Sequence, residues 1–553
     1  MRATPPLRAA VLLLAAIVSG LTPFPAVAQV PERHEHAGGH GEALGLVEFE
    51  NSGAAAAQPA FTRGLALLHS FEYDEAAAAF REAQQADPDF AVAYWMEALS
   101  YSHPLWGEDA PERAAAVLSR LGPTPEPRLA RAGSARERAY GAAIEAYYLD
   151  GDHATRAHAF ADSMRSLVAQ YPDDIDAAAF AALALMAYEY VGSPSAADRA
   201  ALRTDAIDLA ERVFRTSPQH PGGTHYLIHA TDDPAYAVRG LEAARSYAAT
   251  APDAEHALHM PSHIFLQLGM WDEVVSTNER AWAASRAEVA KRGLRNTDLS
   301  FHALQWLQYG YLQQGRYGAA AAVIDTAHAV LAGLDLQHEV DARVTTGWLE
   351  FALAAHAVER VDARSAPWTG VVCERAAAFT PAGPPSSERD RYMQLSETYR
   401  AVVASAACDA DDNAAANAVR ARITNAAASQ PGTQLLRLAL THADAITAML
   451  RGDDAAAIEL LEPLSDGSAL VGPPGTLRTH ELLGNALLRE GRAREAAAVF
   501  SRSLELTPGR VNSLLGLARA SRAAGDEATA RATYEALQSA WHAADRDALD
   551  RVR

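Results

Sequence analysis

The chain contains very little cysteine and lysine, and this scarcity narrows the chemistry open to it. Among 553 residues, the only cysteines are Cys373 and Cys408, and no Cys-x-x-Cys motif occurs. The pair can form one disulfide or stay reduced, but it cannot build a zinc ribbon. Lys291 is the single lysine, which argues against Schiff-base chemistry and against a phosphate-loop lysine. Any metal site must therefore use histidine, aspartate and glutamate.

Basic charge is also scarce. The chain has 48 Lys and Arg residues against 69 Asp and Glu, a formal net charge of −21. This balance argues against a nucleic-acid partner, because phosphate binding needs a basic face. After the first residues, no segment is apolar enough to predict a membrane span.

Familiar catalytic motifs are absent too. The sequence has no Gly-x-Ser-x-Gly elbow, phosphate-cradling loop or dinucleotide fingerprint. His338-Glu339 and His480-Glu481 begin like a zinc-protease helix, but neither is followed by the required second histidine. Sequence motifs therefore leave the reaction class, and catalysis itself, undecided.

The first residues are typical of a secretory signal. Arg2 and Arg8 precede an apolar run, and Ala26-Val27-Ala28 is a small-x-small cleavage site. We interpret 1–28 as a signal peptide and 29–57 as a flexible segment carrying the sequence HEHAGGH. The mature protein is expected to be exported, to a periplasm or beyond, and soluble after cleavage near Ala28.

A repeat dominates the C-terminal part. Gly491 and Gly525 lie 34 residues apart, each at the predicted end of one helix before a second begins. Small Ala496 and aromatic Phe500 mark the second helix, and Pro508 follows it. This pattern resembles the tetratricopeptide repeat, which implies an all-α solenoid of antiparallel helix pairs.

The same pattern recurs upstream with looser spacing, so we predict two helical arrays. The N-terminal array covers 58–360, a connection rich in proline, glycine and serine covers 361–390, and the C-terminal array covers 391–553. The stretches HYLIH and HALHMPSHIF, with GLVEFENSG near the start, resemble a subgroup of exported bacterial tetratricopeptide proteins that has no settled activity. The resemblance implies fold and export rather than chemistry.

Histidines gather within the N-terminal array. In a tetratricopeptide unit, the first helices line a concave groove, and the family pattern places groove-facing side chains near positions two, five and nine. With Gly269 as the turn glycine, His256, His259 and His263 fall at these positions. Pro261 lies inside this helix and is expected to kink or restart it.

A second histidine pair lies on the preceding first helix, which Pro221 is expected to open. His225 and His229 are four residues apart there, and His302 takes position two of the following unit. Neighbouring His-x-x-x-His pairs can surround a transition metal. The predicted ligands are His225, His229, His259, His263, His256 and His302, with His69, His103 and Asp232 as additional candidates.

The sequence does not specify the identity of the metal. Imidazole-rich, sulfur-free surroundings suit copper, zinc or iron. Two clusters of three histidines would indicate a coupled dicopper centre, whereas zinc with an open position would activate water. Asp232 is either a ligand or an acceptor that orients an imidazole N–H.

An alternative hypothesis needs no metal. Repeat solenoids commonly bind partners, so the groove would hold a protein or peptide segment. The histidines would then supply hydrogen bonds and a pH-sensitive charge. Single histidines elsewhere are interpreted as packed or solvated residues, and His220 as a cap at the start of a helix.

Overall fold

The computed structural model describes residues 44–331 and 441–550, apart from short gaps at 106–107, 150, 193–194, 253–254, 443, 450 and 466–478. The described chain is almost entirely helical, which confirms the all-α prediction. The one sheet in these residues is a short hairpin, β1 (Ser102–His103) paired antiparallel with β2 (Glu108–Asp109). The predicted signal peptide, the connection over 361–390 and both cysteines lie outside the described residues.

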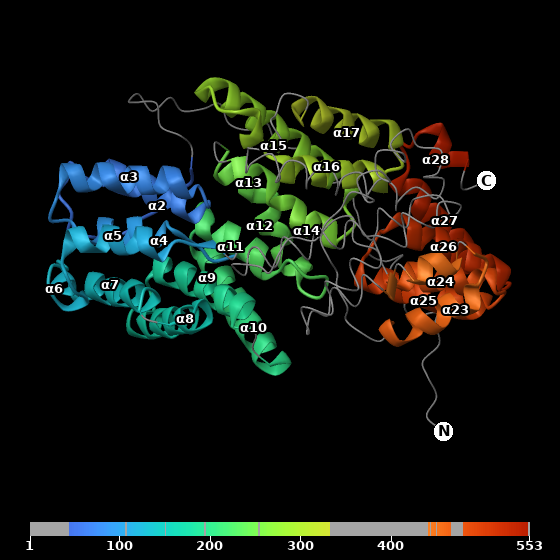
Figure 1. Ribbon diagram of the computed structural model, residues 1–553, viewed down its shortest axis with the longest axis horizontal. Coiled ribbons are helices and arrows are strands. Elements are labelled where there is room, and N and C mark those ends of the chain that lie inside the picture. Colours follow the sequence, from blue (N-terminus) through green and yellow to red (C-terminus); the bar gives the residue numbers. More distant parts are fainter. Residues whose placement is uncertain are drawn as a thin grey trace.

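Consecutive helices pack on one another along the chain (Figure 1). The first nine of these are α2 (Gln58–His69), α3 (Tyr73–Ala86), α4 (Ala91–Leu99), α5 (Pro111–Leu121), α6 (Pro125–Leu129), α7 (Ala135–Tyr147), α8 (His153–Gln170), α9 (Ile175–Val191) and α10 (Ala196–Thr216). None of the described helices combines the length and apolar character needed to cross a bilayer.

The histidine-rich region forms the middle of this stack. Its helices are α11 (Pro221–Ala230), α12 (Ala237–Thr250), α13 (Glu255–His259), α14 (Pro261–Gln267), α15 (Trp271–Arg292), the short 3-10 turn η1 (Asn296–Asp298), α16 (Phe301–Gln313) and α17 (Tyr317–Leu331). Pro221 opens α11 as expected, and Pro261 restarts the chain as α14 instead of continuing α13. The predicted break at Pro261 is therefore confirmed.

The C-terminal repeats follow the predicted pattern. Their helices are α23 (Asp454–Leu461), η3 (Glu462–Leu464), α24 (Thr479–Arg489), α25 (Ala493–Leu506), α26 (Val511–Ala523), α27 (Glu527–Ala540) and α28 (Arg546–Asp550). Gly491 and Gly525 adopt φ of +77° and +83° in the turns between paired helices. Phe500 is fully buried, and a Cβ atom on Gly516 would lie 2.2 Å from its ring. Small residues are thus required where the helices cross.

The C-terminal helices share a hydrophobic cluster with α15, α16 and α17, and the orange and red ribbons lie beside α16 and α17 in Figure 1. The Trp271 indole donates a hydrogen bond to the Gly509 carbonyl at 2.8 Å. The Gln313 side chain accepts from the Val511 amide at 3.2 Å, and its carbonyl accepts from the Trp541 indole at 3.0 Å. These contacts hold α16, which carries His302, against the C-terminal repeats.

Candidate metal centre

The six predicted ligands converge as two histidine groups. The first histidine group is His225 and His229 of α11 with His256 of α13, and the second is His259 of α13, His263 of α14 and His302 of α16. Within each group, one ring nitrogen per histidine lies within 4.8 Å of those of the other two. Each group thus takes a pair spaced by four residues and a third histidine from the next first helix.

The two groups adjoin each other. The ring centroids of His229 and His263 are 6.0 Å apart, and those of His256 and His259 are 6.3 Å apart. Ring separations inside the groups span 4.5–6.4 Å. The separations across the boundary are therefore comparable to the longest separation inside each group, 6.4 and 6.2 Å.

Hydrogen bonds fix the ring orientation in the second group. The Asn278 amide nitrogen donates to the Val274 carbonyl at 2.7 Å, which leaves its oxygen to accept from His259 Nδ1–H at 2.7 Å. The Asp232 carboxylate accepts from His263 Nδ1–H at 2.7 Å. Both Nε2 atoms therefore present lone pairs, yet they face each other at 3.2 Å. Such a contact requires a proton or a metal cation between the rings.

In the first group, the ring of His225 is likewise oriented by an Nδ1–H hydrogen bond, here to a backbone carbonyl. His225 Nδ1–H donates to the backbone carbonyl of His69 at 2.7 Å, so Nε2 carries the lone pair. That Nε2 and the Nε2 of His229 are buried and make no hydrogen bond. Buried polar atoms are nearly always satisfied, by protein, water or a bound ion, so these two nitrogens are available to accept such a partner.

Desolvation keeps these rings neutral. Burial lowers the pKa of His225 to about 3 and that of His302 to about 3. Burial also lowers the pKa of His229, His256 and His259 well below the usual 6.5. Neutral imidazole is the form that ligates a metal, so no proton must first be removed from these rings near pH 7.

One aromatic ring backs each group. The Phe71 ring contacts all three rings of the first group, with centroids 4.3–5.8 Å away. The Trp306 ring contacts all three rings of the second group at 4.3–5.9 Å. Both side chains are buried, so the groups lie in apolar surroundings.

Phe71 was not predicted as a site residue, although its backbone conformation is unusual. It has φ of +62° two residues before α3, a position that glycine fills before five other helices: Gly269, Gly315, Gly452, Gly491 and Gly525. A bulky residue in this conformation costs on the order of 1–3 kcal/mol. The signal in the sequence is a phenylalanine at the place where the repeats use glycine.

A third cluster, the triad of His69, Asp176 and His220, differs in kind. Both histidines donate Nε2–H to Asp176 Oδ1, at 3.2 and 3.3 Å. His69 Nδ1 accepts from the Tyr226 hydroxyl at 3.0 Å, and His220 Nδ1 accepts from the Gly223 amide at 3.2 Å. Every ring nitrogen is thus already used, which makes the triad a packing element. The prediction that His220 caps its helix is confirmed.

The remaining candidates lie around the groups. Asp232 contacts the outer nitrogen of His263 and accepts from Gln267 at 2.9 Å, so it orients a ring and stands outside the ligand sets. His103 stacks on Tyr73 at 4.0 Å, and Tyr73 in turn stacks on Phe71 at 5.2 Å. The structure brings neither His103 nor the His69 side chain into the two histidine groups.

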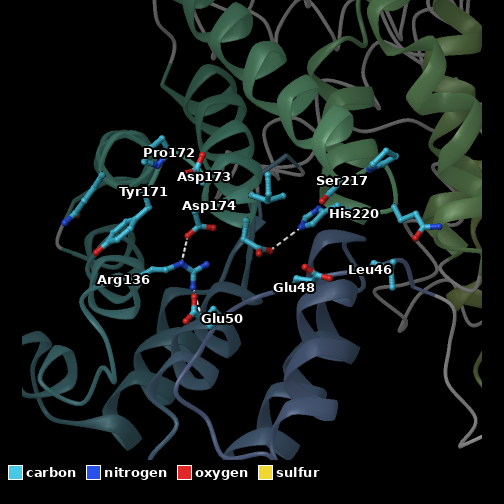
Figure 2. A pocket seen from close by; sticks show the side chains of 15 residues that line it. Leu46, Glu48, Glu50, Arg136, Tyr171, Pro172, Asp173, Asp174, Ser217 and His220 are labelled. Carbon is cyan, nitrogen blue, oxygen red and sulfur yellow. Dashed lines mark hydrogen bonds and ion pairs between the residues drawn. The ribbon is translucent and has the colours of Figure 1, made fainter.

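A separate cavity of about 970 Å³ borders the triad (Figure 2). Figure 2 shows Arg136 bonded to the Asp174 carboxylate and to the Glu50 carbonyl, with His220 on another wall. None of the six grouped histidines lines this cavity. It is acidic and distinct from the metal-centre candidate.

No family model and no curated protein matches the chain. Among solved structures, it is similar to a human IFIT1 dimer with m7Gppp-AAAA, at 12% identity over 90% of this chain and 97% of that chain, with a TM-score of 0.34. It is also similar to the TPR domain of P58(IPK), at 13% identity over 85% and 99%, with a TM-score of 0.20. The chain has a tetratricopeptide-like fold, and these likenesses say nothing further about its function.

Proposed function

We propose that this protein is an exported metalloprotein in which each histidine group binds one transition-metal ion. The ligands are His225, His229 and His256 for one ion, and His259, His263 and His302 for the other. Export rests on the signal-like residues 1–28, and metal binding rests on the histidine geometry. Copper, zinc and iron all accept imidazole ligands.

One observation carries this proposal. His259 and His263 turn Nε2 atoms toward each other at 3.2 Å, although each already donates Nδ1–H elsewhere. With both rings neutral, the two lone pairs would repel each other unless a metal cation lies between them. A metal ion at about 2.0–2.1 Å from each nitrogen removes that repulsion.

The hydrogen bonds made by the Nδ1–H groups also support metal binding. Metal-bound histidines usually donate the second ring N–H to a carboxylate or carbonyl, which fixes the ring and raises its basicity. The carbonyl of His69, the amide oxygen of Asn278 and the carboxylate of Asp232 supply these acceptors.

Burial disfavours the scaffold alternative for these histidines. His225 is fully buried and His259 is 2% exposed. A peptide held in a groove needs accessible side chains, so these rings are poorly placed to contact one. Binding of a protein partner elsewhere on the solenoid would be a separate property that does not involve these rings.

The direct test is metal content. We would purify the full chain without a histidine tag and quantify copper, zinc and iron by mass spectrometry. The expected result is two ions per chain, falling to one in His225→Ala/His229→Ala. The matched control is His158→Ala/His542→Ala, which removes two exposed histidines and should keep both ions.

The same experiment can reject the proposal. A native chain that retains no metal after loading and desalting would exclude the centre. Equal metal content in the native chain and in His225→Ala/His229→Ala would place the metal elsewhere.

A further inference from the structure

We propose that the two histidine groups form one coupled dinuclear copper centre that binds dioxygen between its two ions. This inference rests on the proposed function and deepens it by naming the metal and the small-molecule ligand. It depends on the spacing of the groups, the charge of their ligands and the lining of the site.

The spacing permits a shared ligand. Rings on either side of the boundary, His229 with His263 and His256 with His259, lie 6.0 and 6.3 Å apart. These values match the separations between rings that share one ion. Two ions held by such adjoining groups are expected about 3.5–4 Å apart, the usual spacing of two-metal sites. A diatomic molecule can bridge that gap.

The charge of the ligands favours copper. Both groups consist of imidazoles alone, which bind a metal in their uncharged form, and the Asp232 carboxylate contacts the outer nitrogen of His263. Two zinc(II) or iron(II) ions would therefore place four positive charges in desolvated surroundings, whereas two copper(I) ions place only two. Buried charge without a counter-charge is costly. Of the three metals, copper has the stable monovalent state.

When two copper(I) ions bind dioxygen, the electrons given equal those accepted and the total charge of the centre is unchanged. Each copper(I) gives one electron, and dioxygen accepts both and is reduced to the peroxide level. The resulting dianion bridges two copper(II) ions, so the total charge of the centre stays at two positive charges. Neither a proton nor another reactant is needed for this step.

The coordination number and the lining fit the same chemistry. Three imidazoles per ion leave an open position for an external ligand. Phe71 and Trp306 cover the two groups with apolar surface, which limits the access of water to a reduced oxygen species. The backbone turn with positive φ at Phe71 directs the Phe71 ring against the first histidine group.

The experiment uses the full chain loaded anaerobically with copper(I) and then exposed to oxygen. Oxygen uptake and the integrated electron paramagnetic resonance signal are measured together. We expect one dioxygen per two copper ions and almost no signal, because the two copper(II) spins pair through the bridge.

Variants separate coupling from binding. His225→Ala/His229→Ala and, independently, His302→Ala should each take up no dioxygen and give a signal of about one spin per chain after chemical oxidation. The His158→Ala/His542→Ala control should behave like the native chain. Circular dichroism verifies that each variant is folded.

The outcomes distinguish this inference from the proposed function. Two bound coppers that integrate to two independent spins would overturn the coupled centre and leave metal binding intact. A chain that binds two zinc or iron ions and no copper would also overturn the coupled copper centre and leave metal binding intact. A chain that binds no metal would overturn both.

Discussion

The two histidine groups and the triad of His69, Asp176 and His220 are all histidine-containing clusters, but their hydrogen-bond acceptors lie on opposite sides of the rings. In the triad a carboxylate lies between the rings and accepts both N–H groups. In the histidine groups the acceptors lie on the outer side, and the lone pairs face inward. A histidine cluster is thus a candidate metal site only where the outer nitrogens are engaged and the inner ones are not.

The two regions are physically joined at His69. Its side chain belongs to the triad, while its backbone carbonyl holds the Nδ1–H of His225. A Cβ atom on Gly222 would lie 2.6 Å from His69 Nδ1, so the packing here admits only glycine. The triad therefore supports the first histidine group by fixing the end of α2.

The largest expected effect comes from removing the triad's acceptor. Asp176→Ala leaves two buried N–H groups without an acceptor, and each such loss costs about 1–3 kcal/mol. The free energy of unfolding should fall by about 2–6 kcal/mol in denaturant titrations of the metal-free chain. Metal content per folded chain should fall far less than in His225→Ala/His229→Ala.

The matched variant is His229→Leu, which removes a buried nitrogen that makes no hydrogen bond. Its unfolding free energy in the metal-free chain should change by less than about 1 kcal/mol, since an apolar residue replaces an unsatisfied polar one. Equal destabilisation by Asp176→Ala and His229→Leu would contradict the distinction between the two regions.

A smaller effect is expected from the acceptor of His259. Asn278→Leu removes the oxygen that orients this ring, and loss of such a partner typically weakens metal affinity 10–100-fold. Competition with a chromogenic chelator measures the change. Ser276→Ala, an exposed change on the same helix, is the control. Unchanged affinity in Asn278→Leu would mean that the hydrogen bond does not position His259.

The smallest effect concerns pH. Burial lowers the pKa of His69 to about 4, against 6.5 in an unfolded chain. The unfolded state therefore binds more protons between pH 6.5 and 4, and stability falls as pH decreases through that window. The share of His69 alone should lower the free energy of unfolding by about 1–2 kcal/mol between pH 7 and 5. The buried His225 and His302 add to this fall in the metal-free chain, so the share of His69 is measured as the difference in slope between the native chain and His69→Gln. His158→Ala should keep this slope, and stability independent of pH would contradict the burial of His69 as described.

Much of this arrangement is predictable from local sequence. The 34-residue spacing of Gly491 and Gly525 predicts helix pairs, and Pro221 and Pro261 mark helix starts. The repeat register also places His302 on the next first helix. These features follow from backbone conformation and helix periodicity, which act over a few residues.

Other features depend on residues far apart in the chain. The spacing pattern favours four imidazoles from the two pairs as the primary set, whereas the fold divides six histidines into two groups of three. The acceptor Asn278 and the wall residue Phe71 come from helices and turns whose packing no local pattern specifies. Asp176 is 44 residues from His220 and 107 from His69.

By itself, the sequence determined the helical repeats, the breaks between helices and the identity of the six histidines, because glycine, proline and periodic apolar positions act locally. Only the tertiary structure decided which ring nitrogen of His225, His259 and His263 faces inward. That choice depends on acceptors such as the His69 carbonyl, Asn278 and Asp232, which reach the rings only after distant helices pack.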